Sequence, residues 1–418
     1  MNLLRTLVLK TSEIFPFSIA FRALYHLSVN GIVVFAWLTP EIDSLWIRGS
    51  YARGDFVPGR SDLDFLVVLK NHLNDSDHLQ ALSKIRRRFA LFKRLVPFLG
   101  EIELLEKAQF PSWYHHATDR FELKPLVGGL KTRLPLMSKA ETASKVLIDF
   151  VHFLLPNAEK WSKLEIARLC TKLLRSMGFR TDSLPDDRYH QIATVLQALQ
   201  IWCNEIPWSE AEDSGPPGQV DPLALPSDLS TWASDLIQVF AAPYAPEALF
   251  VVVSPEIDIT KLAGLLKQIC LHKQPARIFT PAVLRFYLNR VSYVEGESLR
   301  QHRMNWGSDL IHDLPREPKT LCDGVLENSA HILSHVNSQE HQLESFHFQL
   351  QWFLRNLLFL EQDEIVLSED QVLKEADQLH PEFRELRETG LAYPSIETHF
   401  RAYRFLAGLL NQEIAKRH

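Results

Sequence analysis

The sequence predicts an α/β (α+β) first domain with a short mixed sheet, followed by a mostly helical C-terminal region that could contain a small α/β insert. Signals for strand, loop, strand, helix and strand follow one another within roughly sixty residues near the N-terminus. Helical periodicity dominates from residue 141 onward, and a β-branched run at 248–254 interrupts it. We therefore expect three domains, at 1–140, 141–228 and 229–418, the second of which ends in a Pro- and Gly-rich linker.

The first domain has distinct local signals for each element. Residues 17–37 have a helical pattern, although Ile32–Phe35 could also be extended. The other expected elements are a strand at Leu45–Arg48, a loop at Tyr51–Ser61, a strand at Asp62–Leu69, a helix at 78–97 and a strand at Glu101–Leu105.

The rest of the chain is expected to be mainly helical. The expected elements are helices at 141–155, 161–177 and 187–203, a loop at 206–228, a strand at Ala248–Ser254, a helix at 258–272, a short strand at Ile278–Thr280, and helices within 320–361 and 381–416.

Charge is unevenly distributed along the 418 residues, whose formal net charge is −6. The first 150 residues carry 20 Lys and Arg against 15 Asp and Glu, and the remaining residues carry 25 against 36. A mildly basic first domain suits a polyphosphate ligand. The acidic remainder argues against a long nucleic-acid track, which requires extended cationic surface.

Cysteine usage and the N-terminal sequence bear on the compartment. The four cysteines (170, 203, 270 and 322) are widely spaced, which excludes a zinc knuckle and favours a reducing compartment. The apolar N-terminus is interrupted by charges, and the longest apolar run, Ile32–Leu38, is far shorter than a membrane span. We expect a soluble cytoplasmic protein without membrane contact.

Residues 46–69 contain the side chains and the glycine turn that are the best candidates for binding phosphate and a metal ion. Gly49 and Ser50 follow a predicted strand, where a glycine turn lets backbone N–H groups and a hydroxyl hold phosphate oxygens. Asp62 and Asp64 alternate on a predicted strand and share one face, which is unfavourable unless a cation binds between them. Mg²⁺ takes carboxylate and phosphate oxygens. If the next strand pairs beside this one, Glu103 completes a three-carboxylate, two-metal site.

These residues resemble the DNA polymerase β-like nucleotidyltransferase superfamily over about residues 40–125. The shared pattern is Gly49-Ser50, an 11-residue spacer, Asp62-Leu63-Asp64 and a third acid, Glu103, on a later strand. Within the superfamily the stretch looks most like the aminoglycoside adenylyltransferases, in which the acceptor binds between a nucleotidyltransferase domain and a helical domain.

The resemblance implies roles for individual residues. Asp62, Asp64 and Glu103 would be the catalytic residues and the ligands of Mg²⁺ or Mn²⁺, with Glu103 also a candidate general base. Gly49 and Ser50 would hold the triphosphate of an NTP, expected to be ATP. The candidate further ligands of the triphosphate are Arg53 and Arg60 in the loop, and Lys172 on the predicted 161–177 helix. Solvated positions are the alternative for these three cations.

Several competing interpretations remain open. Glu101 and Glu106 are alternative third acids, although spacing and flanking apolar residues favour Glu103, and Asp55 is expected to be solvated. The adjacent pair His115-His116 is expected to be structural or solvent-facing, because neighbouring positions point apart. The basic cluster between Lys84 and Arg94 is interpreted as a solvated helix face rather than a nucleic-acid patch.

We expect metal-dependent transfer of a nucleoside monophosphate from an NTP to a hydroxyl of a small molecule or protein, the acceptor being unidentified. The alternatives are synthesis of a nucleotide second messenger, extension of an RNA end, and a non-catalytic nucleotide-binding regulatory module. The sequence specifies no oligomeric state, and nucleic acid is not the expected partner.

Overall fold

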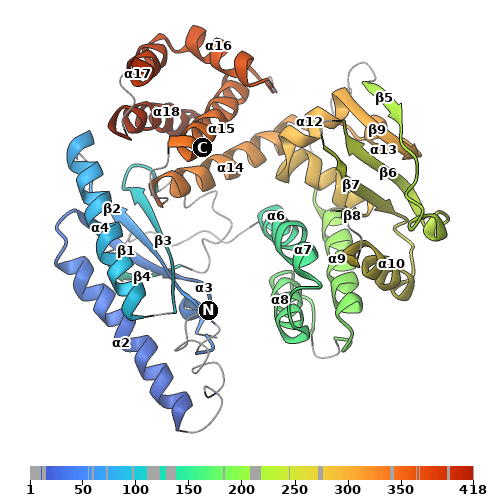
Figure 1. The fold of residues 1–418 in the computed structure, drawn as a ribbon, viewed down its shortest axis with the longest axis horizontal. Coiled ribbons are helices and arrows are strands. Elements are labelled where there is room, and N and C mark those ends of the chain that lie inside the picture. The colour runs from blue at the N-terminus through green and yellow to red at the C-terminus, as the bar shows by residue number, and fades with distance from the viewer. Residues whose placement is uncertain are drawn as a thin grey trace. The chain divides into compact units, whose positions relative to one another are not determined.

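The chain forms two compact units, which are described separately (Figure 1). Unit 1 comprises Met1–Leu136 and Leu326–His418, and unit 2 comprises Met137–Val325. The expected domains follow chain order, whereas unit 1 combines the two ends of the chain. The computed structural model describes residues 11, 16–54, 56–58, 61–71, 74–96, 98–110, 123–128, 138–181, 184–207, 218–243, 245–271, 276–338, 343–363, 365–366, 368–392 and 396–417.

Unit 1 contains a four-stranded mixed sheet with the strand order β3-β2-β1-β4. The strands are β1 (Ile42–Arg48), β2 (Leu63–Leu69), β3 (Leu99–Glu106) and β4 (Lys124–Val127). β1 is antiparallel to β2 and to β4, whereas β2 and β3 are parallel. The short mixed sheet and the helical C-terminal region confirm the predicted fold class.

Two long helices, α2 (Phe17–Trp37) and α4 (Asp75–Leu95), pack with this sheet. α4 connects β2 to β3, as a parallel pair requires. Phe65 of β2 lies against Phe89 of α4 with ring centroids 5.9 Å apart, and Tyr25 of α2 stacks on Phe98 at 4.0 Å. These aromatic contacts form the buried core beneath the sheet.

The C-terminal helices complete unit 1. They are the part of α14 (Pro318–Ser338) from Leu326 onward, α15 (Leu343–Gln362), α16 (Glu369–Leu379), α17 (Pro381–Ala392) and α18 (Ile396–Arg417). Phe400 of α18 stacks on the buried ring of His78 in α4, with centroids 5.0 Å apart. Arg404 of α18 forms an ion pair with Glu106 at the end of β3 at 3.0 Å. α18 is therefore anchored to both the helix and the strand of the N-terminal α/β region.

Unit 2 is built on a five-stranded sheet with the order β5-β9-β6-β7-β8. Its strands are β5 (Gln219–Pro222), β6 (Leu236–Ala242), β7 (Ala245–Val253), β8 (Ala276–Phe279) and β9 (His302–Gly307). The small α/β insert expected near residues 248–280 is therefore present, with more strands than the sequence indicated. β5 and β9, and β7 and β8, pair in parallel, whereas β6 is antiparallel to β7 and β9.

The helices expected at 141, 161, 187 and 258 begin within two residues of those positions, at Lys139, Lys163, Arg188 and Ile259. Ser162 and Glu165 form a capping box at the start of α8, and Asp187 caps α9 by accepting from two main-chain N–H groups. The helical segments are α6 (Lys139–Ile148), a π-helix (Asp149–Leu154), α7 (Leu155–Asn157), α8 (Lys163–Ser176), α9 (Arg188–Glu205), a 3₁₀-helix (Ser230–Trp232), α10 (Ile259–Leu271), α11 (Pro281–Phe286), a π-helix (Tyr287–Val291), α12 (Tyr293–Gln301) and α13 (Leu310–Asp313).

Three local expectations need correction. Ile32–Phe35 is helical, because Ile32 and Phe35 fall on the buried face of α2 at helical spacing. The expected loop at Tyr51–Ser61 begins as helix, since α3 spans Gly49–Arg53. Within the expected linker at 206–228, residues 219–222 form an edge strand, because pairing with β9 satisfies their backbone groups.

Candidate active site

The turn after β1 brings Gly49 and Ser50 to one end of the sheet. β1 ends at Arg48, and the short helix α3 begins at the next residue. Gly49 has φ +71°, a left-handed conformation that glycine adopts without steric cost. A Cβ atom at Gly49 would lie 3.6 Å from Asp64 Oδ2. The glycine-serine turn therefore lies directly against one of the predicted metal ligands.

Side chains of α2 fix the segment that leads into the acidic pair. Tyr25 is buried and donates its hydroxyl to the main-chain oxygen of Ser61 at 2.7 Å. His26 Nδ1 lies 2.5 Å from the hydroxyl of Tyr51, whose pKa is raised by burial. Because Ser61 immediately precedes Asp62, these contacts limit the movement of the first carboxylate.

Asp62 and Asp64 converge on Gly100 of the neighbouring strand. The main-chain N–H of Glu101 donates to Asp64 Oδ1 at 2.9 Å. A Cβ atom at Gly100 would lie 2.0 Å from Asp64 Oδ1 and 2.9 Å from Asp62 Cβ. A side chain there is therefore incompatible with the position of Asp64. Glycine at this position opens the space that the carboxylate occupies.

The carboxyl group of Asp64 lies in an environment that opposes its ionisation. Burial is the largest influence and raises its pKa. The Glu101 N–H and the guanidinium of Arg48 lower the pKa, whereas the charges of Asp62 and Glu101 raise it again, and the net direction is upward. A bound cation would favour the ionised form, so this environment suits a carboxylate that functions as a metal ligand.

Arg48 links the third acid to this cluster. It pairs with Asp64 in the β1–β2 register, and its side chain forms an ion pair with Glu103. A second contact joins Arg48 Nη2 and Glu101 Oε2 at 3.6 Å. Glu103 lies beside Leu66 in the parallel β2–β3 register, which places it on the Asp64 face of the sheet, two residues further along. Glu103 is buried, whereas the Glu101 side chain is 74% exposed.

Glu106, another alternative for the third acid, has a structural environment. Its carboxylate forms the ion pair with Arg404 of α18 at 3.0 Å and lies 3.7 Å from His78 Nε2. Both partners anchor α18 to the α/β region. Glu106 therefore serves the packing of unit 1 rather than the cluster around Arg48.

The carboxylates next to Gly100 can be compared with the usual ligands of a divalent ion. Mg²⁺ in nucleotide-dependent enzymes is bound by one or two carboxylates and completes its shell with phosphate oxygens and water. Asp62 and Asp64 provide two such carboxylates at alternate positions, both next to Gly100, and fit that description. Among the residues that the structure describes, no group of three or more His, Cys, Asp or Glu side chains is arranged to hold a metal ion. Convergence of Glu103 with the aspartates on a metal thus stays a prediction.

The other predicted ligands have varied positions. Arg53 is exposed at the end of α3, and Lys172 is half-buried on α8 in unit 2. Asp55, Arg60 and the pair His115-His116 lie outside the described residues. The part played by these groups stays a prediction.

Arg48 and Gly100 are the two residues of this cluster that sequence reasoning missed. A signal existed for each. Arg48 directly precedes the glycine-serine turn at a strand end, and Gly100 is an isolated glycine within a strand, which often indicates close approach of another group.

Comparison with known families agrees with this geometry. A family model described as a nucleotidyltransferase domain matches residues 29–117. The matched stretch includes β1, β2 and β3 together with the cluster around Gly100. It supports the polymerase β-like superfamily for this part of the chain, and with it nucleotidyl transfer as the general activity. No curated protein and no solved structure matches the chain.

Proposed function

We propose that the protein transfers a nucleoside monophosphate, AMP in the first instance, from an NTP to a hydroxyl of a small molecule or protein. The observation that supports this most directly is the convergence of Asp62 and Asp64 on Gly100, beside the Gly49 turn. This combination provides a carboxylate pair for a divalent ion next to a backbone turn suited to phosphate. The match of residues 29–117 to a nucleotidyltransferase domain agrees with the proposal.

The turn and the aspartates have separate tasks in the proposed reaction. Gly49 and Ser50 bind the β- and γ-phosphates through main-chain N–H groups and a hydroxyl. Asp62 and Asp64 would hold Mg²⁺ or Mn²⁺, which would neutralise charge on the transferred phosphoryl group. Gly100 keeps the space for Asp64 open, and the hydrogen bond from Glu101 N–H orients its carboxylate.

The proposed chemical step is a substitution at the α-phosphorus of the NTP. The acceptor oxygen forms a bond to the α-phosphorus, and the bond from that phosphorus to the bridging oxygen of the β-phosphate breaks. Pyrophosphate leaves, and the hydroxyl proton passes to Glu103 or to water. Arg48 contacts Glu103 through Oε1, so in the proposed reaction the guanidinium would lie beside the reacting groups, where a cation favours the developing charge on phosphate oxygens.

The finer parts of the proposal are the acceptor, the nucleotide and further phosphate ligands. The resemblance to aminoglycoside adenylyltransferases favours ATP as donor and a small-molecule hydroxyl as acceptor. The widely spaced cysteines favour the cytoplasm as the compartment. Arg53, Arg60 and Lys172 are the proposed additional ligands of the triphosphate.

A labelling experiment tests the reaction and identifies the acceptor. The protein is incubated with each α-³²P-labelled NTP and Mg²⁺ or Mn²⁺, with aminoglycosides, cell lysate, tRNA or no acceptor, and with EDTA as the metal-free control. Label on a small molecule or a protein, lost with EDTA and in Asp64→Asn, is the expected result. Label on tRNA or in an oligonucleotide product would instead support the RNA-end or second-messenger alternative. Nucleotide binding without any transfer would support a non-catalytic module and overturn the proposal.

A further inference from the structure

The outer face of α2 is a continuous apolar stripe. Its exposed residues recur at spacings of three and four, so they lie on one side of the helix. Leu27, Trp37 and Leu38 are 66, 72 and 71% exposed. The stripe consists of Ala20, Ala23, Leu24, Leu27, Gly31, Val34 and Leu38, with Ile19 and Trp37 at its margin. Apolar surface of this extent on a solvent face indicates an interaction site.

The opposite face of α2 is fixed in the core of unit 1. Tyr25, Val29, Ile32 and Phe35 are buried, and Tyr25 stacks on Phe98. α2 is the one described helix that is long and apolar enough to cross a membrane, yet only 28% of its most apolar window is buried. Crossing a bilayer would remove the buried residues from the sheet. The helix can therefore lie along an apolar phase while keeping its inner contacts.

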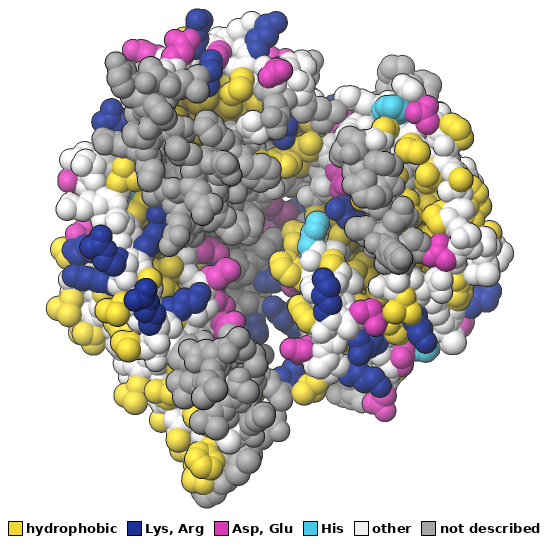
Figure 2. Space-filling model, in the orientation of Figure 1, with side chains coloured by type: hydrophobic (Ala, Val, Ile, Leu, Met, Phe, Trp, Pro, Cys, Tyr) yellow, Lys and Arg dark blue, Asp and Glu magenta, His cyan; other side chains and the backbone are white. Residues whose placement is uncertain are grey.

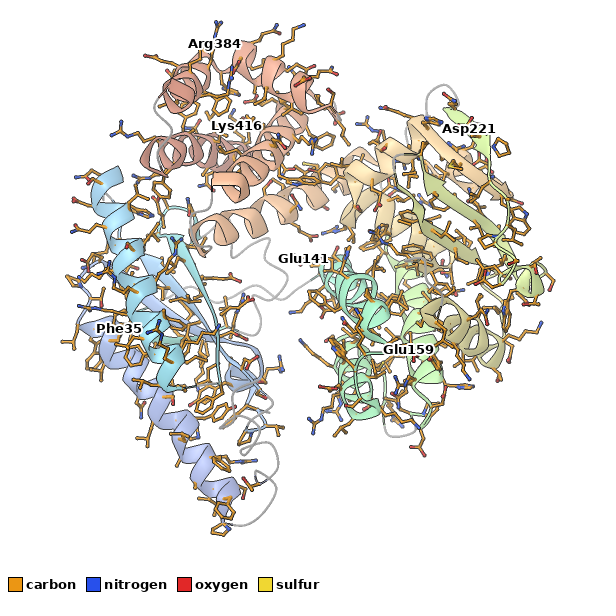
Figure 3. All side chains as sticks on the ribbon, viewed as in Figure 1. Phe35, Glu141, Glu159, Asp221, Arg384 and Lys416 are labelled. Atoms are coloured by element: carbon orange, nitrogen blue, oxygen red, sulfur yellow. The ribbon has the colours of Figure 1, made fainter. Side chains whose placement is uncertain are left out.

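α4 extends the same surface with cations. Phe35, which is labelled in Figure 3, and Phe92 join the two helices with ring centroids 6.0 Å apart. The guanidinium of Arg88 lies 5.7 Å from the centre of the Phe35 ring. Next to this junction Leu91 and Leu95 of α4 are exposed. The basic side chains that are exposed on α4 are Arg87, Arg88, Lys93 and Arg94. Figure 2 shows hydrophobic and basic side chains next to one another at the lower left of the view.

The residues that define this surface include no Asp or Glu, although α4 begins with Asp75 and Asp77 and Glu41 forms an ion pair with Lys84. Residues 17–37 contain no Asp or Glu, and neither do residues 78–100. An apolar stripe beside an uninterrupted set of cations is the pattern of a helix that lies in the interface of an anionic bilayer. The long Arg side chains can keep their charged ends among lipid headgroups while their stems cover apolar surface.

We propose that this α2–α4 surface, defined by the stripe of α2 together with Arg87, Leu91, Arg94 and Leu95, binds the surface of an anionic lipid membrane. This assignment departs from the expectation of no membrane contact and is independent of the proposed nucleotidyl transfer. A second copy of the chain is a poorer occupant, because a symmetric contact would bring two sets of like-charged arginines together. An anionic bilayer has the complementary charge and accepts the apolar side chains.

Vesicle binding by the full-length protein tests the proposal. The probes are vesicles of phosphatidylcholine alone and of phosphatidylcholine with about one third phosphatidylglycerol, measured by co-sedimentation at low and at high salt. We expect binding to the anionic vesicles only, weakened by salt because the charges involved are exposed. Equal binding to both vesicles, or binding to neither, overturns the proposal.

Two variants separate the apolar and the cationic contributions. The double variant Arg87→Glu/Arg94→Glu is expected to weaken anionic-vesicle binding by at least about 25-fold, since each basic residue contributes about fivefold. Leu27→Gln/Leu91→Gln is expected to weaken it about tenfold through lost apolar burial. These four side chains are exposed, so the thermal midpoint should stay within a few degrees of the parent.

Matched controls carry the same changes on unit 2. Leu164→Gln and Arg180→Glu alter exposed residues of like chemistry outside the α2–α4 surface. These variants should bind vesicles as the parent does, and equal losses would overturn the assignment of the surface. Two competing occupants are measured directly. A dimer in light scattering that Leu27→Gln/Leu91→Gln dissociates would assign the surface to a second copy. RNA binding lost in Arg87→Glu/Arg94→Glu, without vesicle binding, would assign it to nucleic acid.

Discussion

The two sheets of this protein differ in how completely their charged side chains are paired. At one end of the unit 1 sheet, Asp62 and Asp64 lie next to Gly100. Glu101 and Glu103 of the same strand as Gly100 contact Arg48, so four carboxylates are close to one arginine. In the unit 2 sheet, Arg303 and Arg277 have acidic partners. Arg303, whose side chain is 2% exposed, binds Asp309, and Arg277 binds Glu295 at 2.8 Å. The second sheet is neutralised within the protein, whereas the first contains a local excess of carboxylate.

Charged groups that are paired within the protein stabilise the fold, whereas carboxylates without enough nearby cations indicate a binding site for a positively charged ligand. A buried guanidinium with a matched carboxylate satisfies its own hydrogen bonds and needs no further partner. When burial and a nearby carboxylate both disfavour the ionised form, as they do for Asp64 beside Asp62, the charged group lowers stability unless a cation binds. The comparison therefore predicts that substitutions at the first sheet change activity and that equivalent substitutions at the second change stability.

The largest effect is expected when one aspartate in each sheet is replaced. Asp64→Asn should lower kcat about 10³-fold, equivalent to about 4 kcal/mol, because a metal ligand is lost. Asp309→Asn should leave kcat unchanged but lower the free energy of unfolding by about 2 kcal/mol, since buried Arg303 loses a partner that is itself partly exposed. Initial rates and urea denaturation measure the two effects. Full activity in Asp64→Asn would contradict the site.

A glycine in each sheet provides a second comparison. The Cβ atom of Gly100→Ala would displace the Asp64 carboxylate, so kcat should fall about 10²-fold. Gly307→Ala places a Cβ atom 2.4 Å from the main-chain oxygen of Ile237 at a residue with φ +85°. It should lower the free energy of unfolding by about 2 kcal/mol without affecting the kcat of the folded fraction. Loss of stability alone in Gly100→Ala would show that the glycine serves folding only.

The third acid is tested by two glutamates on the same strand. Glu103→Gln should lower kcat by about 10² and abolish the acidic limb of the kcat/KM pH profile, if Glu103 accepts the acceptor proton. Glu101→Gln should change kcat less than about threefold, because this side chain is mostly exposed. The opposite order of effects would assign the role to Glu101.

The smallest effect is expected at the other end of β3. Glu106→Gln should lower the free energy of unfolding by about 1 kcal/mol, because the charged contact with Arg404 becomes neutral. Its kcat should equal that of the parent protein. Glu106 would then resemble Asp309 of unit 2, because its replacement changes stability but not kcat. A selective loss of kcat would instead extend the active site along β3.

Much of the N-terminal site could be predicted because its signals are local. A run rich in β-branched and aromatic residues predicted β2, and helical periodicity with a stop at Pro97 predicted α4. The sequence placed Glu103 beside the aspartates only if its strand pairs with β2, and the parallel β2–β3 register shows that pairing. The helical start of the loop after Ser50 was missed, since a single turn of helix has no periodic pattern.

The sequence by itself determined the elements around the candidate site and the neighbourhood of Gly49, Asp62 and Asp64, because turn chemistry and strand alternation depend on residues close in the chain. The tertiary structure alone decided that Arg48 pairs with Glu103 and that Gly100 receives the Asp64 carboxylate. It also decided that residues 326–418 return to the N-terminal unit. Such contacts join segments far apart in sequence, and their register and burial are set by packing that no local pattern encodes.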